Sequence, residues 1–200
     1  LIMTILLLCA GMNLHEAFCH TFGTLATGGF STRNASIGAY DSIAIEIIIT
    51  VFMAIAGTNF GLLYCMSRRE WRKVINNSEW RLYVFILVVS SLLITINLMG
   101  VQGSIHVIDA HKEPVQSHGF LEGLRMATFQ VVSVMTTTGY ITEDFDTWPY
   151  FSRALLVVLM FVGGCSSSTG GGLKIIRVLI LFKLVLYHLK HTFYPKRIHV

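Results

Sequence analysis

The chain has 200 residues, of which 54% are hydrophobic and only 13% are charged, and its mean hydropathy is +0.64. Ordinary soluble domains carry about 25% charged residues, so this composition excludes an ordinary soluble domain and indicates a chain that lies in lipid. The net charge of +4 raises the question of a nucleic-acid partner. The basic residues gather beside apolar segments, however, which is typical of the cytoplasmic flanks of membrane helices and argues against nucleic acid.

The first part of the chain contains two apolar segments with a short amphipathic segment between them. Residues 1–12 are typical of the end of a membrane-spanning helix, and we expect a fragment of a longer protein because the chain starts inside this run. The sequence N-L-H-E matches a capping box and predicts a short re-entrant helix over 13–25. Residues 43–66 contain one formal charge, Glu46, and are long enough to predict one span. Within that span, A-G-T-N-F-G at 56–61 is a weak break that we expect to pack.

The second part of the chain repeats this order of segments. Residues 82–101 carry no formal charge and predict a second span. A second re-entrant helix is expected to begin near Ser117 or His118 and to end near Met135. Both re-entrant helices are too short, or too polar at their ends, to be spans themselves.

The charges predict an orientation in the membrane. Basic residues are enriched on the cytoplasmic side of membrane proteins, so we expect segments 67–73 and 188–200 to be cytoplasmic. Segments 102–117 and 141–148 are then periplasmic. The acidic residues of these outer loops are Asp109, Glu113, Glu143, Asp144 and Asp146.

An internal repeat links the two polar loops. T-G-G-F-S-T at 27–32 shares the pattern T-x-G-aromatic-x-T with T-T-G-Y-I-T at 137–142, and Gly139 lies 110 positions after Gly29. The register predicts two units, each with an outward span, a re-entrant helix, a polar loop and an inward span.

The two polar loops are the predicted ion-binding segments. Irregular backbone at membrane depth is tolerated where it is buried in protein or lines water. Glycine adopts a positive φ without steric cost, so Gly29 and Gly139 can turn carbonyl groups toward one side, as in filters that replace the hydration shell of potassium. The negative ends of the preceding helices favour a cation there. The alternative is that each loop is an ordinary helix C-cap and turn.

The last apolar region predicts a broken membrane helix. Residues 150–163 and 173–187 are each too short to span the membrane alone, and a glycine- and serine-rich stretch separates them. A flexible break below a filter is expected to act as a gate; the alternative is a packing patch of small residues. Lys174 and Arg177 follow the break and are candidate gate-associated charges. The predicted gate loop consists of Gly163, Gly164, Cys165, Ser166, Ser167, Ser168, Thr169, Gly170, Gly171 and Gly172.

Enzyme motifs fail on spacing. His15 and His20 are five positions apart rather than the four of a zinc-protease helix, and Lys174 is not followed by the Ser or Thr of a phosphate-binding loop. The four cysteines include no C-x-x-C pair. The chain is therefore predicted not to be an enzyme. The alternatives left open are a non-transporting scaffold or sensor and an intramembrane hydrolase with a reactive serine in 166–168.

Three segments together resemble the Trk/Ktr/HKT superfamily of cation transporters. They are L-A-T-G-G-F-S-T, T-T-T-G-Y-I-T-E-D-F-D and G-G-C-S-S-S-T-G-G-G-L-K-I-I-R, and the similarity is closest to the membrane subunits of bacterial Trk systems. The resemblance implies an all-α integral membrane fold of repeated M1–P–M2 units, potassium-channel-like, with four repeats around one pore. Residues 1–75 are then the second repeat, 76–190 the third and 191–200 a cytoplasmic basic linker, with the first and fourth repeats absent.

The resemblance also implies roles for individual residues. The ion-binding filter positions are Thr27, Gly28, Gly29, Thr137, Thr138 and Gly139, and the flanking positions are Ala26, Phe30, Thr136 and Tyr140. The loop 163–172 gates the pore. The implied function is potassium uptake across a bacterial inner membrane, with K⁺ as the transported ion and no organic cofactor. The implied partners are membrane lipid, a second copy in a homodimer and a cytoplasmic nucleotide-binding ring of the TrkA type.

Overall fold

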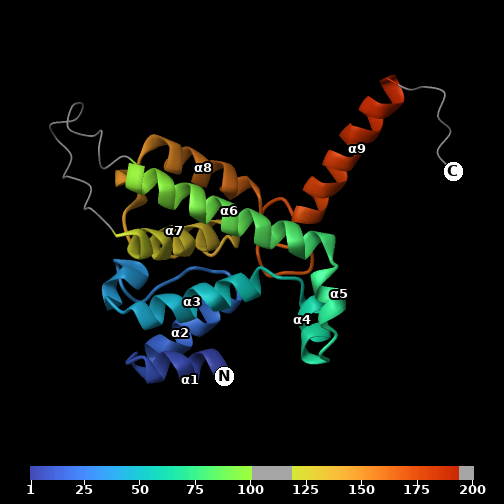
Figure 1. The fold of residues 1–200 in the computed structure, drawn as a ribbon. Helices are drawn as coiled ribbons and strands as arrows, with labels where there is room; N and C mark the ends of the chain where they lie inside the picture. The colour runs from blue at the N-terminus through green and yellow to red at the C-terminus, as the bar shows by residue number, and fades with distance from the viewer. Residues whose placement is uncertain (101–118, 194–200) are drawn as a thin grey trace.

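The computed structural model describes residues 1–100 and 119–193, and within this part its regular elements are helices, as the sequence predicts (Figure 1). The predicted outer loop 102–117, the helix start near Ser117 or His118, and residues 194–200 lie outside the described residues. The elements are α1 (Ile2–Cys9), α2 (Leu14–Leu25), η1 (Ser36–Tyr40), α3 (Ile43–Ala56), α4 (Phe60–Ser67), α5 (Trp71–Ile75), α6 (Ser78–Gly100), α7 (Phe120–Met135), η3 (Phe145–Thr147), α8 (Tyr150–Phe161) and α9 (Ile175–Phe193).

Helix α6 confirms the prediction of a span over 82–101. It has 23 residues and a mean hydropathy of 2.4, and is the one unbroken described helix that is long and apolar enough to cross a membrane. At about 1.5 Å per residue, its length exceeds a hydrocarbon core of about 30 Å. Helix α6 is therefore long enough to span the membrane without a break.

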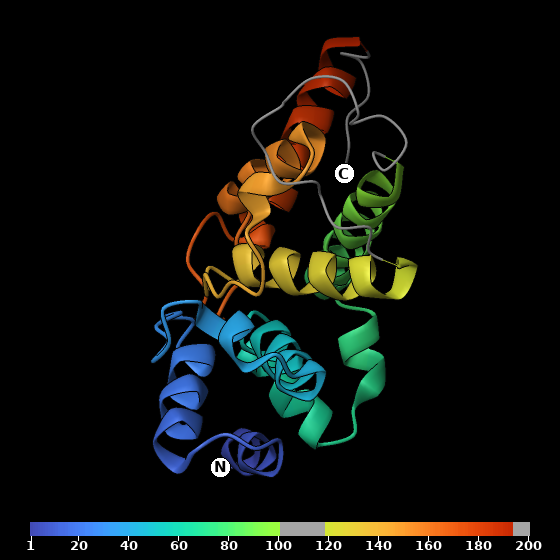
Figure 2. The same ribbon diagram turned by 90° about the vertical axis from the view of Figure 1, so that its left-hand side faces the viewer.

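Helix α7 lies at the centre of the described chain. Both ribbon views place it between α3 on one side and α6 with α8 on the other, and it packs against all three (Figures 1 and 2). Residues 129–135 of α7 are buried without interruption, although α7 is a re-entrant helix by its position in the sequence. A helix that is buried all round belongs to the interior of the protein rather than to its lipid surface. The polar loop that follows α7 is thereby held inside the fold.

The prediction of only a weak break within the span over 43–66 is wrong. Helix α3 ends at Ala56, α4 begins at Phe60, and their axes meet at 107°. The Asn59 side chain caps α4 by accepting a hydrogen bond from the Gly61 N–H at 2.8 Å. A Cβ built on Gly57 would lie only 2.5 Å from the Tyr83 hydroxyl and 2.8 Å from Thr136 Cγ2, so a side chain at this corner would have to displace both of these side chains. The glycine and the asparagine cap together explain the bend.

The predicted capping box at the start of α2 is also wrong, although the helix bounds are confirmed. Asn13 is the N-cap residue of α2, but its side chain makes no capping hydrogen bond. Glu16 instead accepts from Arg33 Nε at 2.9 Å and pairs with its Nη2 at 2.8 Å. Hydrogen bonding with Tyr40 and the charge of Glu16 raise the pKa of Arg33. Glu16 thus ties α2 to the segment that leaves the first polar loop.

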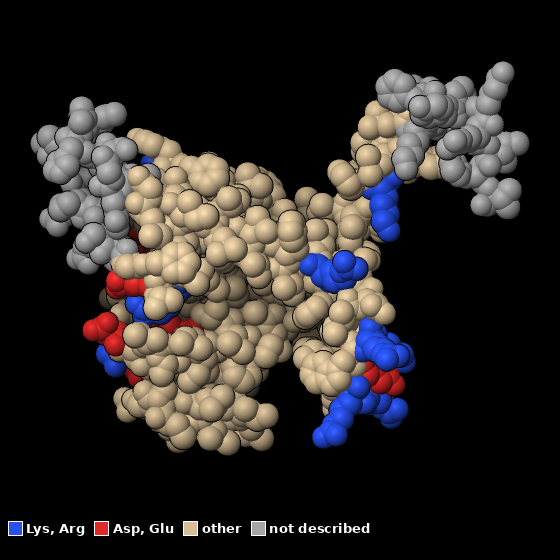
Figure 3. Space-filling model, in the orientation of Figure 1, with Lys and Arg blue, Asp and Glu red and all other residues tan. Residues whose placement is uncertain are grey.

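Charged side chains gather at the two ends of α6. Lys and Arg lie over α4, α5 and the start of α9, whereas Asp and Glu concentrate at the opposite end, beside the start of α7 (Figure 3). On the basic side, the hydrogen bond that Lys73 donates to Glu70 and the charge of Glu70 raise the pKa of Lys73, whose Nζ lies 2.7 Å from a Glu70 carboxylate oxygen. This separation agrees with the predicted orientation, which stays a prediction.

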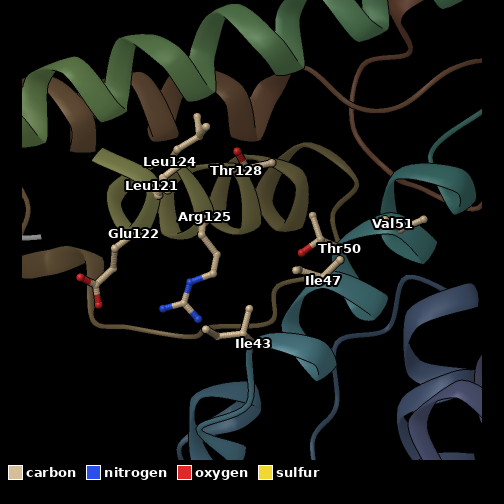
Figure 4. A pocket seen from close by; sticks show the side chains of 9 residues that line it. All are labelled: Ile43, Ile47, Thr50, Val51, Leu121, Glu122, Leu124, Arg125 and Thr128. Atoms are coloured by element: carbon tan, nitrogen blue, oxygen red, sulfur yellow. The ribbon is translucent and has the colours of Figure 1, made fainter. Parts of the chain in front are cut away.

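An ion pair joins α3 to α7. Arg125 Nη1 lies 2.6 Å from Glu46 Oε2, so Glu46 connects the two helices. Arg125 also lines an open groove of about 680 Å³ between the two helices, in which its side chain points toward the start of α3 near Ile43 (Figure 4).

Glu46→Gln is expected to lower the stability of the full-length protein by on the order of 3 kcal/mol, since it leaves a partly buried guanidinium without its carboxylate. Thermal unfolding in detergent measures this. The double variant Glu46→Gln/Arg125→Met should recover most of the loss, because no unpaired charge remains. If Glu46→Gln unfolded at the same temperature as the wild type, the ion pair would contribute nothing to stability.

Candidate ion-conduction site

The two polar loops have the same backbone conformation. Helix α2 ends at Leu25 and α7 at Met135, and the next residues, Ala26 and Thr136, have φ/ψ of −82°/−1° and −81°/−1°. The left-handed residues that follow are Thr27 (φ 52°), Gly29 (φ 70°), Thr137 (φ 57°) and Gly139 (φ 83°). Each residue of the first loop corresponds to the residue 110 positions later, as the repeat predicts.

The C-terminal caps of α2 and α7 do not use the equivalent glycines of the repeat, Gly29 and Gly139, as their left-handed residues. Thr27 N–H donates to Thr24 O at 3.1 Å, and Gly28 N–H donates to Gly23 O at 2.8 Å, which is the pattern of a Schellman cap. The second loop repeats it from Thr137 and Thr138. The left-handed cap residue in each loop is thus a threonine, and the glycine comes two positions later. The cap therefore does not account for Gly29 or Gly139.

The left-handed conformation of the two threonines is not predicted from the sequence. A positive φ is unusual for a β-branched residue, and strained backbone of this kind is concentrated at functional sites. Thr27 and Thr137 occupy it in the same register. Both residues are held there by contacts from a distant segment, which are described below.

The structure brings the two polar loops against each other. A Cβ built on Gly29 would overlap the carbonyl oxygen of Thr138, so only glycine fits at this contact. The buried Tyr140 donates its hydroxyl hydrogen to Phe30 O at 3.4 Å. The outgoing segments stay together, because Ile37 N–H donates to Ile141 O at 3.1 Å. The predicted filter residues thus form one assembly.

The segment 163–172 lies directly against both polar loops. Thr27 Oγ1 donates to Thr169 O at 3.1 Å, and Gly171 N–H donates to Thr137 Oγ1 at 2.7 Å. Thr136 and Thr138 are engaged differently, since their hydroxyl oxygens lie 2.8 Å apart and are buried. The two left-handed threonines are therefore the ones that contact the predicted gate loop.

The predicted break in the last apolar region is confirmed. Helix α8 ends at Phe161 and α9 begins at Ile175. The neck of the loop is closed by an isolated parallel bridge between Val162 and Leu173, with Gly163 N–H donating to Leu173 O at 2.9 Å. A Cβ on Gly163 would overlap the Gly171 carbonyl oxygen, so the neck requires a glycine.

The bend between α3 and α4 forms the seat of the loop. Cys165 N–H donates to Gly57 O at 2.9 Å, and Phe60 N–H donates to Ser167 O at 3.2 Å. Thr169 Oγ1 donates to Ala56 O at 3.2 Å. The A-G-T-N-F-G segment therefore packs against the loop 163–172, as expected. It does so through backbone N–H and C=O groups that the break in the helix leaves available.

Of the two predicted gate-associated charges, one contacts the loop. Lys174 Nζ donates to Ser168 Oγ at 3.2 Å and to the carbonyl oxygen of Gly170. Arg177 is exposed, and its side chain makes none of the described contacts with the loop. The sequence-based reasoning missed Glu79, a buried acid at the start of α6 that accepts two hydrogen bonds from Ser166. An acid close to a span is the signal that could have indicated it.

The described residues contain no cluster of three or more His, Cys, Asp or Glu side chains placed to hold a metal ion. The oxygen atoms at the two polar loops are backbone carbonyls and threonine hydroxyls. Backbone carbonyls are the groups that replace the hydration shell of potassium in channel filters.

Residues 2–200 match the TrkH family, described as a cation transport protein. The chain belongs to the TrkH family. TrkH, the Trk system potassium uptake protein of Escherichia coli K12, is 38% identical over 191 residues, which are 95% of this chain and 37% of the relative. TrkG of the same strain is 32% identical over 188 residues, covering 94% of this chain and 36% of the relative. This TrkH-family chain thus spans well under half the length of these relatives.

A solved structure supports the assignment of the fold. The crystal structure of the potassium transporter TrkH from Vibrio parahaemolyticus matches this TrkH-family chain with a TM-score of 0.85 and 33% identity, covering 99% of this chain and 40% of that one. The predicted fold class, an all-α membrane protein of M1–P–M2 units, is confirmed. Membership of a family of cation transport proteins also supports the predicted transporter over an enzyme.

Proposed function

We propose that the chain supplies two filter segments and the gate of a potassium uptake pathway across a bacterial inner membrane. The observation that carries this proposal is the direct contact of the loop 163–172 with both left-handed threonines, Thr27 and Thr137. A cation that passed between the two polar loops would meet this loop next. We infer potassium as the ion because the related proteins are named potassium uptake proteins.

In the proposed mechanism, potassium loses its water to the carbonyl groups around Gly29 and Gly139. The C-terminal ends of α2 and α7 point their negative dipole ends at the loops and favour a cation there. The acids at the outer end raise the local cation concentration. The ion then enters a space above the loop 163–172, which must move before the ion can leave toward the basic end.

The arrangement of repeats and partners is part of the same proposal. Residues 1–75 and 76–190 are the second and third of four repeats, and 191–200 is a linker. The segments 67–73 and 188–200 face the cytoplasm, and 102–117 and 141–148 face the periplasm. A second copy and a nucleotide-binding ring complete the system. Coverage of 37% of the related TrkH protein supports the view that further repeats are needed to close a pore.

Monovalent-cation flux through the full-length protein in liposomes, with K⁺, Rb⁺ and Na⁺ compared, tests the proposal. A K⁺ and Rb⁺ flux above that of Na⁺ supports it. A non-transporting scaffold or sensor predicts no flux above that of protein-free liposomes.

Thr137→Val is expected to raise potassium flux about fivefold, because the N–H of Gly171 loses its acceptor and a hydrogen bond contributes about 1 kcal/mol. Thr137→Ser keeps the hydroxyl and is expected to conduct like the wild type. Rubidium uptake into liposomes measures both variants. Equal uptake by the valine and serine variants would show that this hydrogen bond does not hold the loop.

A further inference from the structure

Glu79 makes an unusual contact with the gate loop. Only 4% of its surface is exposed, and it lies in the first turn of α6. Its Oε1 accepts a hydrogen bond from the Ser166 backbone N–H at 2.5 Å, and its Oε2 accepts one from the Ser166 hydroxyl at 2.8 Å. One residue of the loop thus satisfies both oxygens of a buried carboxylate.

Ser166 also connects to the bend that seats the loop. Asn59 Nδ2 donates to Ser166 Oγ at 3.3 Å, while Asn59 Oδ1 caps α4. The serine hydroxyl is therefore a donor to Glu79 and an acceptor from Asn59. Three elements that are distant in the sequence, α4, α6 and the loop, meet at this side chain.

The rest of the loop is held by other groups. Lys174 binds the carbonyl side near Ser168 and Gly170. The polar loops bind Thr169 and Gly171. In the described contacts of the loop, Glu79 is the acidic side chain, and it accepts hydrogen bonds with its carboxylate oxygens. The acceptors in most of the other contacts are backbone oxygens.

We propose that Glu79 is the latch of the gate: its carboxylate holds Ser166 in the position seen here, and release of Ser166 is a step in opening. The proposal rests on the gating role proposed above for 163–172. Its physical basis is that a buried carboxylate is costly unless it is hydrogen-bonded. Any loop position that removes Ser166 leaves both Glu79 oxygens without these donors, and so is disfavoured until water reaches the carboxylate.

Such a latch gives the loop two distinct positions rather than a continuous range. With Ser166 bound, the carboxylate is buried and both of its oxygens accept hydrogen bonds. With Ser166 released, the carboxylate must be hydrated, which requires the loop to leave its seat. Glu79 is thus a positioning residue: it acts on the ion only through the loop.

The test uses the full-length protein in liposomes with Glu79→Ala, Glu79→Gln and Ser166→Ala. We expect Glu79→Ala to raise potassium flux about tenfold, since a hydrogen bond to a charged group contributes about a factor of ten or more. Ser166→Ala removes only the hydroxyl donor and keeps the backbone N–H bond to Oε1, so it should give a smaller rise. Glu79→Gln keeps one acceptor oxygen and should give a smaller rise. The K⁺ to Na⁺ flux ratio should stay unchanged, because the polar loops are not altered. Glu70→Ala removes an exposed acid from the same end of the molecule and should conduct like the wild type.

A second readout does not depend on transport. Cys165 is buried, and its N–H binds Gly57 O. In a protein whose other cysteines are replaced by serine, Glu79→Ala should raise the rate at which a small maleimide labels Cys165 by about the same factor as the flux. Ser166 and Glu79 should also be coupled, so that the flux and the labelling rate of the double alanine variant do not exceed those of Glu79→Ala.

Wild-type flux and wild-type labelling in Glu79→Gln and Ser166→Ala would overturn the latch, even if Glu79→Ala failed to fold. The gate itself is tested separately by shortening the loop. If shortening the loop raises flux and the Glu79 and Ser166 variants do not, the gating role of residues 163–172 is supported and the proposal for Glu79 is wrong. If neither changes flux while labelling of Cys165 rises, the loop is held by Glu79 but does not gate, and the proposal in its present form is wrong.

Discussion

Gly29→Ala is expected to reduce potassium flux through the full-length protein by about a hundredfold or more, the largest effect of any single substitution considered. The added Cβ would overlap the Thr138 carbonyl oxygen and lie 2.8 Å from its carbonyl carbon. These are backbone atoms of the neighbouring loop, so no side-chain rotation relieves the contact. The left-handed φ of 70° adds strain for a residue with a Cβ. Together these effects approach 3 kcal/mol, which corresponds to about two decades.

The measurement is rubidium uptake in liposomes, with the amount of folded protein checked by gel filtration in detergent. Gly123→Ala is the matched control, because it lies in α7 and its Cβ would meet Thr95 Cγ2 at an ordinary 3.8 Å. Gly139→Ala is informative by contrast. Among the described residues no atom lies within 4 Å of its Cβ, so only backbone strain opposes it, and a milder loss is expected. Full flux in Gly29→Ala would show that the two loops do not meet as described.

Deletion of residues 166–169 is expected to raise resting potassium flux by an order of magnitude or more. The deletion removes the groups that bind Glu79, the α3–α4 bend and Thr27. Each hydrogen bond contributes about 1 kcal/mol, and several are lost together. The glycine neck at Gly163 and the bridge between Val162 and Leu173 stay in place, so α8 and α9 should keep their positions.

Flux and the thermal midpoint in detergent should be measured together, because a collapsed protein would also leak. Replacing the same four residues by alanines keeps the length of the loop and removes only its side-chain hydrogen bonds. An intermediate rise is expected for that variant. If the shortened loop conducts like the wild type at an unchanged thermal midpoint, residues 163–172 are packing and not a gate.

Much of this arrangement could be predicted from the sequence. The repeat of 110 residues placed Gly29 and Gly139 in equivalent loops, and their conformations agree. Helix α2 has the predicted end at Leu25, and α7 ends at the predicted Met135. These features are local: the helix ends and the loops carry their own glycine and threonine pattern, so no knowledge of distant contacts is needed to find them.

The features that were not predicted depend on distant contacts. The sequence indicates the bend at Gly57 only as a weak break, because it lies in a run whose average hydropathy is that of one span. Its contacts with Tyr83 and with the loop 163–172 show that it is a sharp corner. The left-handed Thr137 goes against local preference and is held by Gly171. Glu79 resembles an ordinary acid at a helix start until the loop is seen to cover it. The bend, the left-handed threonine and the buried acid each depend on tertiary contacts, which local sequence does not reveal.

The bridge between Val162 and Leu173 has a consequence for the speed of the gate that we propose for residues 163–172. Because the two ends of the loop are hydrogen-bonded to each other, the ten residues between them can change conformation without any change in the distance between α8 and α9. Rearrangements of a short loop take place in nanoseconds to microseconds, whereas movements of whole helices or domains take microseconds to milliseconds. A gate with a closed neck can therefore respond on the faster scale, while the two helices that carry it stay still.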